Sequence, residues 1–339
     1  MKKIFLFVAI ASFMVMGANA QDSKSLFGEA QKAYNNYFLK AQSGNLDEEG
    51  AQGLQQSFDL FNQALSCDTI FETNKDGSPK LDKKTGLPKF KTKVSGDIVK
   101  AFGTMIDQND FLIVGEYYRA KEDFHNAAIA YGHGADLLQS KYATNNVDVS
   151  NLAEVFFLQG FANYFDGDYK NCFINMVKAK DLGYTANNID QFIDDAPNQI
   201  IRKYVDESNY AAANEALEHM IDAVPTNNNL YILKARVQEF EKGFEAAIPA
   251  YETALEKDPN NAFANYCMGV GYSGLVSNAI NESKAMTDAG VAKDIANLLD
   301  KPIEYLDKAV TLKNNISDEM IQDAQNKLEL LRKYKELAQ

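Results

Sequence analysis

Two stretches of the chain repeat one pattern 34 residues apart, and this spacing constrains the fold more than any other feature of the sequence. The stretches are Asn209–Pro225 and Gly243–Pro259, and each has an aromatic residue near its start, then alanines, then a closing proline. Tyr210 and Phe244 lie at matching places, 34 positions apart. A period of this length is typical of a unit of two helices, which buries its apolar face only when neighbouring units stack against it. The spacing therefore predicts an array of helix pairs.

The rest of the chain from Gln21 onward has a similar helical pattern. Long stretches are rich in Ala, Leu, Glu and Lys, with aromatic residues at three- and four-residue spacing and with Asn, Gly and Pro between the stretches. No strand pattern alternates with these helices, so a parallel α/β sheet is disfavoured. On the 34-residue frame, units are expected near residues 25–68, 108–141, 153–184, 194–225, 228–259 and 262–312.

Small and aromatic residues follow a set order within these units. In the unit near 108–141, Gly115 and Tyr118 lie in the first helix, and Ala127 and Tyr131 lie in the second. A small residue lets two helices approach to ~8–10 Å, and rings fill the space beside it. With this order and the 34-residue period, the chain resembles the tetratricopeptide repeat (TPR) family over about residues 25–312. The resemblance implies an all-α fold, an α-α superhelix or TPR solenoid, in which the first helices line a concave wall.

Two insertions and a final helix depart from the period. The first insertion, about residues 69–97, combines Asp76-Gly77 and Gly86-Leu87-Pro88 with flanks that alternate apolar and polar residues, which predicts a small β-hairpin or extended loop. The second insertion, about residues 275–297, keeps a helical pattern. Residues 317–337 place apolar side chains on one stripe after a helix-starting Ser317, and this predicts a C-terminal capping helix.

The first insertion is basic although the chain is acidic. The segment Lys75–Lys93 holds seven lysines and two aspartates, whereas the whole chain has 34 basic and 47 acidic residues and a net charge of −13. Two interpretations of residues 75–93 are open: a solvated loop whose lysines keep an edge strand from pairing, or an arm that docks an acidic partner or a membrane surface. The acidic balance of the whole argues against nucleic-acid binding, which needs a cationic face.

The first twenty residues have the order of a secretory signal peptide. Two lysines precede an apolar run at Ile4–Met16, and small residues at Gly17–Ala20 precede a cleavage site before Gln21. The run is too short to span a bilayer, which takes ~20 apolar residues. We expect residues 1–20 to be removed after export, and residues 21–339 to form a soluble, periplasmic, helical repeat domain without a transmembrane segment.

No residue pattern predicts catalysis, a cofactor or a metal site. Gly269–Gly274 spells G-x-G-x-x-G, but dinucleotide binding needs a preceding strand and an acid ~20 residues later, whereas this motif falls in the first helix of a repeat. His125 and His133 are eight residues apart, which does not direct two ligands at one metal. The three cysteines are expected to be free thiols, because the units that hold them are too far apart for disulfides.

The TPR resemblance also implies which side chains line the concave face. Aromatic residues concentrate between positions 156 and 165, and an exposed apolar strip of this kind favours a contact surface. If the repeat frame is shifted by one residue, the same rings are core instead. The implied partner-binding residues are Arg119, Phe157, Phe161, Tyr164, Phe165, Arg202, Ile232, Arg236, Phe263 and Tyr266.

Three classes of function compete on these grounds. The favoured one is a non-enzymatic interaction or scaffold protein of the bacterial envelope that binds a peptide or partner protein on the concave face, with rings as anchors and arginines holding acidic groups. The alternative is a glycan-binding accessory protein of an outer-membrane uptake system, and the absence of tryptophan counts against it. The third class, an enzyme, has no supporting constellation of residues.

Overall fold

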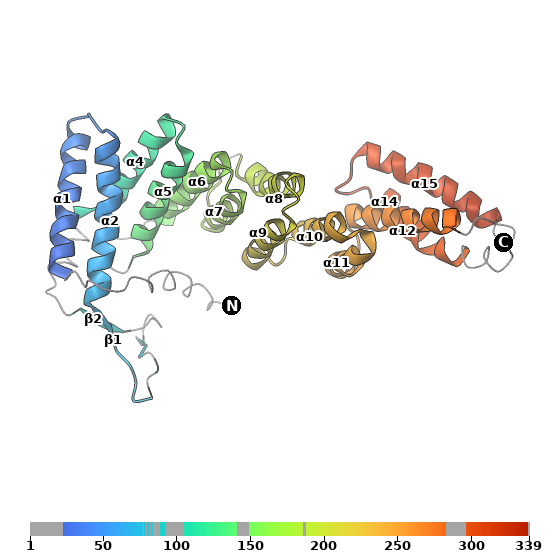
Figure 1. Cartoon of the computed structure of the whole chain (residues 1–339), viewed down its shortest axis with the longest axis horizontal. Coiled ribbons are helices and arrows are strands. Elements are labelled where there is room, and N and C mark those ends of the chain that lie inside the picture. The colour runs from blue at the N-terminus through green and yellow to red at the C-terminus, as the bar shows by residue number, and fades with distance from the viewer. Residues whose placement is uncertain are drawn as a thin grey trace. The chain divides into compact units, whose positions relative to one another are not determined.

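The computed structural model describes residues 23–76, 78, 80–81, 83, 89–92, 105–140, 149–185, 188–282 and 296–337. The expected signal peptide at 1–20, and residues 283–295 of the second expected insertion, lie outside these ranges. The described part of the chain consists of α-helices and two short strands between α2 and α4 (Figure 1). The predicted all-α fold of successive helix pairs, with a small hairpin and a C-terminal helix, is confirmed.

Two compact units divide the chain, and each is described by itself. The first holds residues up to 162 together with 181–184, and the second holds 163–180 and everything from 185 onward. In the first unit, α1 packs along α2 and α4 packs along α5. Its helices are α1 (Ser23–Gln42), α2 (Glu48–Asp68), α4 (Gln108–Ala120), α5 (Phe124–Gln139) and most of α6 (Val149–Asp166).

The second unit contains the two stretches that repeat in the sequence. Tyr210 begins α9 and Phe244 begins α11, so the 34-residue period separates the starts of two second helices. Helix α10 packs on α11, α12 packs on α14, and α15 packs on both members of that last pair. The helices are α7 (Tyr169–Asp181), α8 (Ile189–Asp206), α9 (Tyr210–Ala223), α10 (Asn228–Lys242), α11 (Phe244–Lys257), α12 (Ala262–Glu282), α14 (Asp300–Leu312) and α15 (Asp318–Leu337).

Short polar side chains begin several of these helices. The side chain of Asp123 accepts a hydrogen bond from the backbone N–H of Asn126 at 3.1 Å, at the start of α5. Ser317 accepts one from the backbone N–H of Met320 at 3.2 Å, at the start of α15. Each satisfies a donor that has no partner within its own helix.

The first insertion forms the predicted hairpin. Strands β1 (Thr69–Phe71) and β2 (Phe90–Thr92) are antiparallel, as alternation of apolar and polar residues on either side of turn-forming residues leads one to expect. The paired residues are Thr69 with Thr92, Ile70 with Lys91, and Phe71 with Phe90.

Glycine allows helices to meet closely in both units. A Cβ atom on Gly115 of α4 would lie 2.3 Å from Cε1 of Tyr131 on α5, and one on Gly271 of α12 would lie 2.1 Å from the ring of Phe244 on α11. Real Cβ atoms do not approach a ring so closely, so each glycine makes room for the aromatic side chain of the facing helix. The G-x-G-x-x-G motif therefore lies inside α12, where Gly271 serves helix packing.

We predict opposite effects of alanine at two glycines of α12. Gly271→Ala should lower the free energy of unfolding by about 1–3 kcal/mol, because the Phe244 ring must move. Gly274→Ala, with nothing within 4 Å of its Cβ, should raise the free energy of unfolding by about 0.5–1 kcal/mol through helix propensity. Urea unfolding of the two variants checks this; equal effects would contradict the packing role of Gly271.

Candidate functional site

The described residues hold no arrangement typical of catalysis. Within them, no group of three or more His, Cys, Asp and Glu residues is placed to hold a metal ion. Cys172 and Cys267 are free thiols, and burial raises the pKa of both, that of Cys267 to about 12, so both stay protonated at neutral pH. The side chain of Cys67 lies outside the described part. No helix in the described ranges combines the length and apolar character needed to cross a bilayer.

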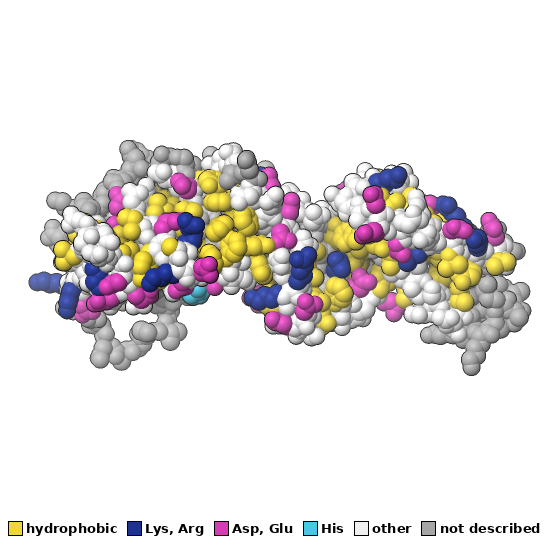
Figure 2. All heavy atoms as spheres, turned by 90° about the horizontal axis from the view of Figure 1, so that it is seen from above, with side chains coloured by type: hydrophobic (Ala, Val, Ile, Leu, Met, Phe, Trp, Pro, Cys, Tyr) yellow, Lys and Arg dark blue, Asp and Glu magenta, His cyan; other side chains and the backbone are white. Residues whose placement is uncertain are grey.

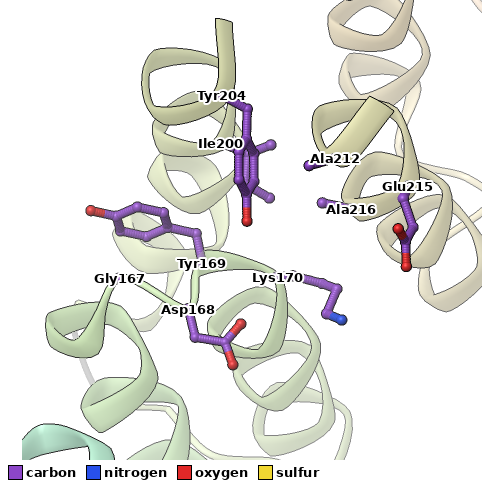
Figure 3. Close-up of a pocket in the computed structure, with 9 residues that line it drawn as sticks. All are labelled: Gly167, Asp168, Tyr169, Lys170, Ile200, Tyr204, Ala212, Glu215 and Ala216. Carbon is purple, nitrogen blue, oxygen red and sulfur yellow. The ribbon is translucent and has the colours of Figure 1, made fainter. Parts of the chain in front are cut away.

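One hollow has a polar lining and a small volume. It measures about 160 Å³ and lies between the α6–α7 turn, α8 and α9 (Figure 3). Small-molecule sites usually begin at ~300 Å³. Asp168 at its edge already accepts hydrogen bonds from the backbone and side-chain amide of Asn171, at 3.2 and 2.6 Å, and so starts α7. The lining residues are Gly167, Asp168, Tyr169, Lys170, Ile200, Tyr204, Ala212, Glu215 and Ala216. The hollow is therefore not a strong candidate for a ligand site.

A similar tyrosine–glutamate hydrogen bond occurs in the α4–α5 pair of the first unit and in the α10–α11 pair of the second. Tyr131 and Tyr251 lie seven residues after the starts of α5 and α11, at Phe124 and Phe244. The Tyr131 hydroxyl donates to Glu116 at 2.6 Å, and the Tyr251 hydroxyl donates to a carboxylate at the same distance. Each tyrosine thus ties the second helix of its pair to a glutamate on the first.

The charges on the first helices of these pairs are in opposite order. Glu116 and Arg119 lie on α4, whereas the positions in the same frame on α10 hold Arg236 and Glu239. On α4 the Arg119 Nε donates to Glu116 at 3.0 Å, and the pair is half exposed. On α10 the Tyr251 hydroxyl bonds to Glu239, and within the described residues Arg236 makes no ion pair.

Arg236 lies instead beside two phenylalanine rings. Its guanidinium carbon is 5.4 Å from the ring centre of Phe240 and 5.8 Å from that of Phe263, within the range of a cation–π interaction. Phe240 is 48% exposed. The three side chains, from α10 and α12, form what we call the Arg236 patch: a guanidinium beside two phenylalanine rings.

A second aromatic cluster surrounds Tyr164 in the same unit. Its ring meets those of Tyr169 and Phe192 edge-on, with centroids 5.5 and 5.0 Å apart, and its hydroxyl donates to Asp195. Burial raises the pKa of Asp195, but the hydrogen bonds from Tyr164 and Gln199 and the nearby Arg202 outweigh it and hold that pKa below its ordinary value. The neighbouring Phe165 is 51% exposed.

The other rings of α6 belong to the first unit. Phe157 stacks on Tyr184, with ring centroids 4.5 Å apart and an angle of 25° between the planes, and Phe161 lies 6.5 Å from Phe157. All three side chains are partly exposed. On the face shown in Figure 2, hydrophobic side chains gather in patches among charged ones.

Two residues of the predicted partner-binding set, Ile232 and Tyr266, make contacts inside the protein. Ile232 is 1% exposed and lies in a core cluster with Ala235 and Tyr251, so its prediction as a groove residue is wrong: its side chain faces the interior of the helix pair. Tyr266 is partly buried and donates its hydroxyl to Asp323 of α15 at 2.8 Å. The set therefore separates into local groups: Phe157 with Phe161, Tyr164 with Phe165 and Arg202, and Arg236 with Phe263.

The sequence reasoning missed the partners that fix these groups. Phe192, Asp195 and Tyr184 lie beyond the helix that holds Tyr164 and Phe157, and Glu239 was not singled out. One signal was present for Glu239: it lies three residues after Arg236, as Arg119 lies three after Glu116, with the signs exchanged.

Comparison with known proteins gives structural matches alone. No family model and no curated protein matches the sequence. Among solved structures, the chain is similar to YrrB, described as a TPR protein with an unusual peptide-binding site (14% identity, 65% of this chain and 92% of that one, TM-score 0.32). It is also similar to a putative protein binding protein from Bacteroides ovatus (15%, 55% and 99%, 0.33) and to MamA (18%, 62% and 96%, 0.29). These TM-scores lie below 0.5. The successive helix pairs of the chain itself show that its fold is that of a helix-pair repeat protein.

We predict that Ile232 and Phe240 differ sharply in their contribution to stability. Ile232→Ala should lower the free energy of unfolding by about 2–5 kcal/mol, as large-to-small changes in a closed core do. Phe240→Ala should change it by less than about 1 kcal/mol, because half of the ring is exposed. Chemical denaturation of both variants checks this, and a large loss in Phe240→Ala would show that the Arg236 patch is core.

We also predict that Tyr164 controls the ionisation of Asp195. Tyr164→Phe removes a hydrogen-bond donor to the carboxylate, so the pKa of Asp195 should rise toward its ordinary value. In the native protein the lowered pKa of Asp195 contributes to the free energy of unfolding at neutral pH, and this contribution is lost as the pH falls through that pKa. The difference in the free energy of unfolding between the native protein and Tyr164→Phe should therefore become smaller in acid. Carbon-13 NMR titration and pH-dependent unfolding test this; Gln199→Leu, which removes the other donor, should shift the pKa in the same direction.

Proposed function

We propose that this chain is a non-enzymatic interaction protein of the bacterial envelope that binds an acidic segment of another polypeptide, and that the Arg236 patch is its central contact. The observation that carries the proposal is a guanidinium placed over two phenylalanine rings while the nearby carboxylate of Glu239 accepts from Tyr251. Arginine and aromatic side chains dominate the binding energy of protein interfaces.

The chemistry of the patch suits a carboxylate flanked by apolar atoms. A guanidinium that rests on rings keeps its in-plane N–H groups for a bidentate bond to a carboxylate. The half-exposed ring of Phe240 offers apolar area beside it. An aspartate or glutamate next to a leucine or an aromatic residue would use both features at once.

We assign a secondary role in binding to other residues of the predicted partner-binding set. Phe165 and Arg202 have exposed side chains in the second unit, and Phe157 and Phe161 have partly exposed rings in the first. We assign them to additional contacts within their own units. Arg119, which is bound to Glu116, would contribute less than Arg236, because a ligand carboxylate must first compete with that glutamate.

We predict that the purified chain selects acidic peptides and that Arg236 is responsible. The screen contains peptides rich in Asp and Glu, each paired with a neutral version in which every Asp is replaced by Asn and every Glu by Gln. The acidic peptide of each pair should bind more tightly than its neutral version. For a selected peptide, Arg236→Gln should weaken binding at least tenfold, because a charged hydrogen bond contributes about 1.5–3 kcal/mol. Isothermal titration calorimetry measures the affinities.

The control is a lysine at the end of the same helix. Lys242 is exposed and ion-paired with Glu241, so Lys242→Gln makes the same charge change and should leave the affinity within about twofold. Equal affinity of the native protein and Arg236→Gln, or no preference for acidic peptides, would remove the patch from the proposal.

A further inference from the structure

The insertion between α2 and α4 has a charge opposite to that of the protein. Seven lysines and two aspartates lie between Lys75 and Lys93, in a chain whose net charge is −13. We call the described residues of this segment, 72–76, 78, 80–81, 83 and 89–92, the basic hairpin. The function proposed above does not involve this hairpin. The packing of α2 and α4 on either side of it does not explain why so many lysines lie between them.

Backbone hydrogen bonds bring three segments of the basic hairpin together. The N–H of Glu72 donates to the carbonyl of Lys89 at 2.8 Å, and the N–H of Lys80 donates to the carbonyl of Glu72 at 2.9 Å. The N–H of Lys89 donates to the carbonyl of Lys80 at 2.7 Å. These bonds make Lys80 and Lys89 neighbours, so the fold brings these two lysines together.

Two acidic groups of this segment, Glu72 and Asp76, make local contacts. Glu72 pairs with Lys80 at 2.9 Å. Asp76 accepts hydrogen bonds from the hydroxyl and the backbone N–H of Ser78, at 2.6 and 3.0 Å, which hold its pKa below the ordinary value. Within the described residues, Lys75, Lys83 and Lys89 make no ion pair. Their charges are therefore not neutralised by any residue in the described part of the chain.

An exposed leucine lies among these lysines. Leu81 is 54% exposed, between Lys80 and Lys83 in the chain. Cationic side chains around an apolar one are the pattern of segments that lie at the surface of a bilayer, where ammonium groups meet headgroup phosphates and the apolar group enters the boundary. A solvated loop has no need of the leucine, and a purely electrostatic contact with an acidic protein makes no use of it.

The hairpin also extends away from the acidic helices of its unit. Figure 1 shows it running beyond the end of α2. At ~3.3 Å per residue, the chain from Phe71 to Lys75 reaches about 13 Å, which exceeds the ~8 Å over which charges are screened at physiological ionic strength. Lys75 can therefore meet an anionic surface while the acidic body stays largely screened from it.

We propose that the basic hairpin docks this protein on an anionic lipid surface, with Lys75, Lys83 and Lys89 at headgroup phosphates and Leu81 at the edge of the acyl region. A lipid surface fits better than an acidic protein because a diffuse layer of phosphates needs no shaped pocket, and it accepts the exposed leucine. The docking is independent of the Arg236 patch.

The test is co-sedimentation of the purified chain with vesicles. One set contains 30% phosphatidylglycerol in phosphatidylcholine and the other contains phosphatidylcholine alone. We expect binding to the anionic vesicles, little to the neutral ones, and weakening as salt is raised. The triple variant Lys75→Gln/Lys83→Gln/Lys89→Gln should lose at least tenfold in partition coefficient, and Leu81→Ser should lose about threefold.

A matched triple variant separates the hairpin from net charge. Lys242→Gln/Lys308→Gln/Lys333→Gln makes the same change of charge at exposed lysines of α10, α14 and α15, and should bind like the native protein. Circular dichroism confirms that both triple variants are folded. Absence of binding to anionic vesicles, or equal losses in the two triple variants, would overturn the proposal. The proposal would also be overturned if the protein bound poly-glutamate as tightly as anionic vesicles and if Leu81→Ser left that binding unchanged. Such a result would indicate that the partner of the hairpin is an acidic protein.

Discussion

Two close contacts between helices in this protein depend on a glycine, which has no side chain, opposite an aromatic ring. Gly115 faces Tyr131, and Gly271 faces Phe244, at distances that leave no room for a methyl group. Because the ring can then lie across the facing helix, its far end reaches a polar group there, as the Tyr131 hydroxyl reaches Glu116. One small residue thereby sets both the spacing of a helix pair and the position of a hydrogen bond that joins its members.

The exchange of charges between α4 and α10 shows how one scaffold gives two surfaces. In both places a tyrosine binds the glutamate of an arginine–glutamate pair three residues apart. When glutamate comes first, as at Glu116, the arginine stays bound to it. When arginine comes first, as at Arg236, the tyrosine again binds the glutamate, Glu239, and the guanidinium lies beside two phenylalanine rings. The two helix pairs therefore share the tyrosine–glutamate hydrogen bond and differ in what their arginine contacts.

The sequence predicted the fold well because the period and the small residues act locally. The helix pairs, the hairpin at β1 and β2 and the C-terminal helix all follow from spacing and turn chemistry. The candidate site was less predictable. Consecutive positions of a helix point ~100° apart, so a small error of frame puts Ile232 in the core instead of on the surface. Contacts such as Tyr164 with Phe192 join separate helices, and no short-range pattern in the chain encodes them.

The packing of α15 on α12 and α14 affects whether further helix pairs can be added after them. Leu328 and Leu331 are buried in a cluster with Leu306 of α14, and Asp323 holds the Tyr266 hydroxyl of α12. Another helix pair, whether from an engineered extension or from a neighbouring copy, would have to displace α15 before it could reach these residues. The face of α12 and α14 that α15 covers is therefore already occupied, and lengthening the protein by design would start by opening the contact between α14 and α15.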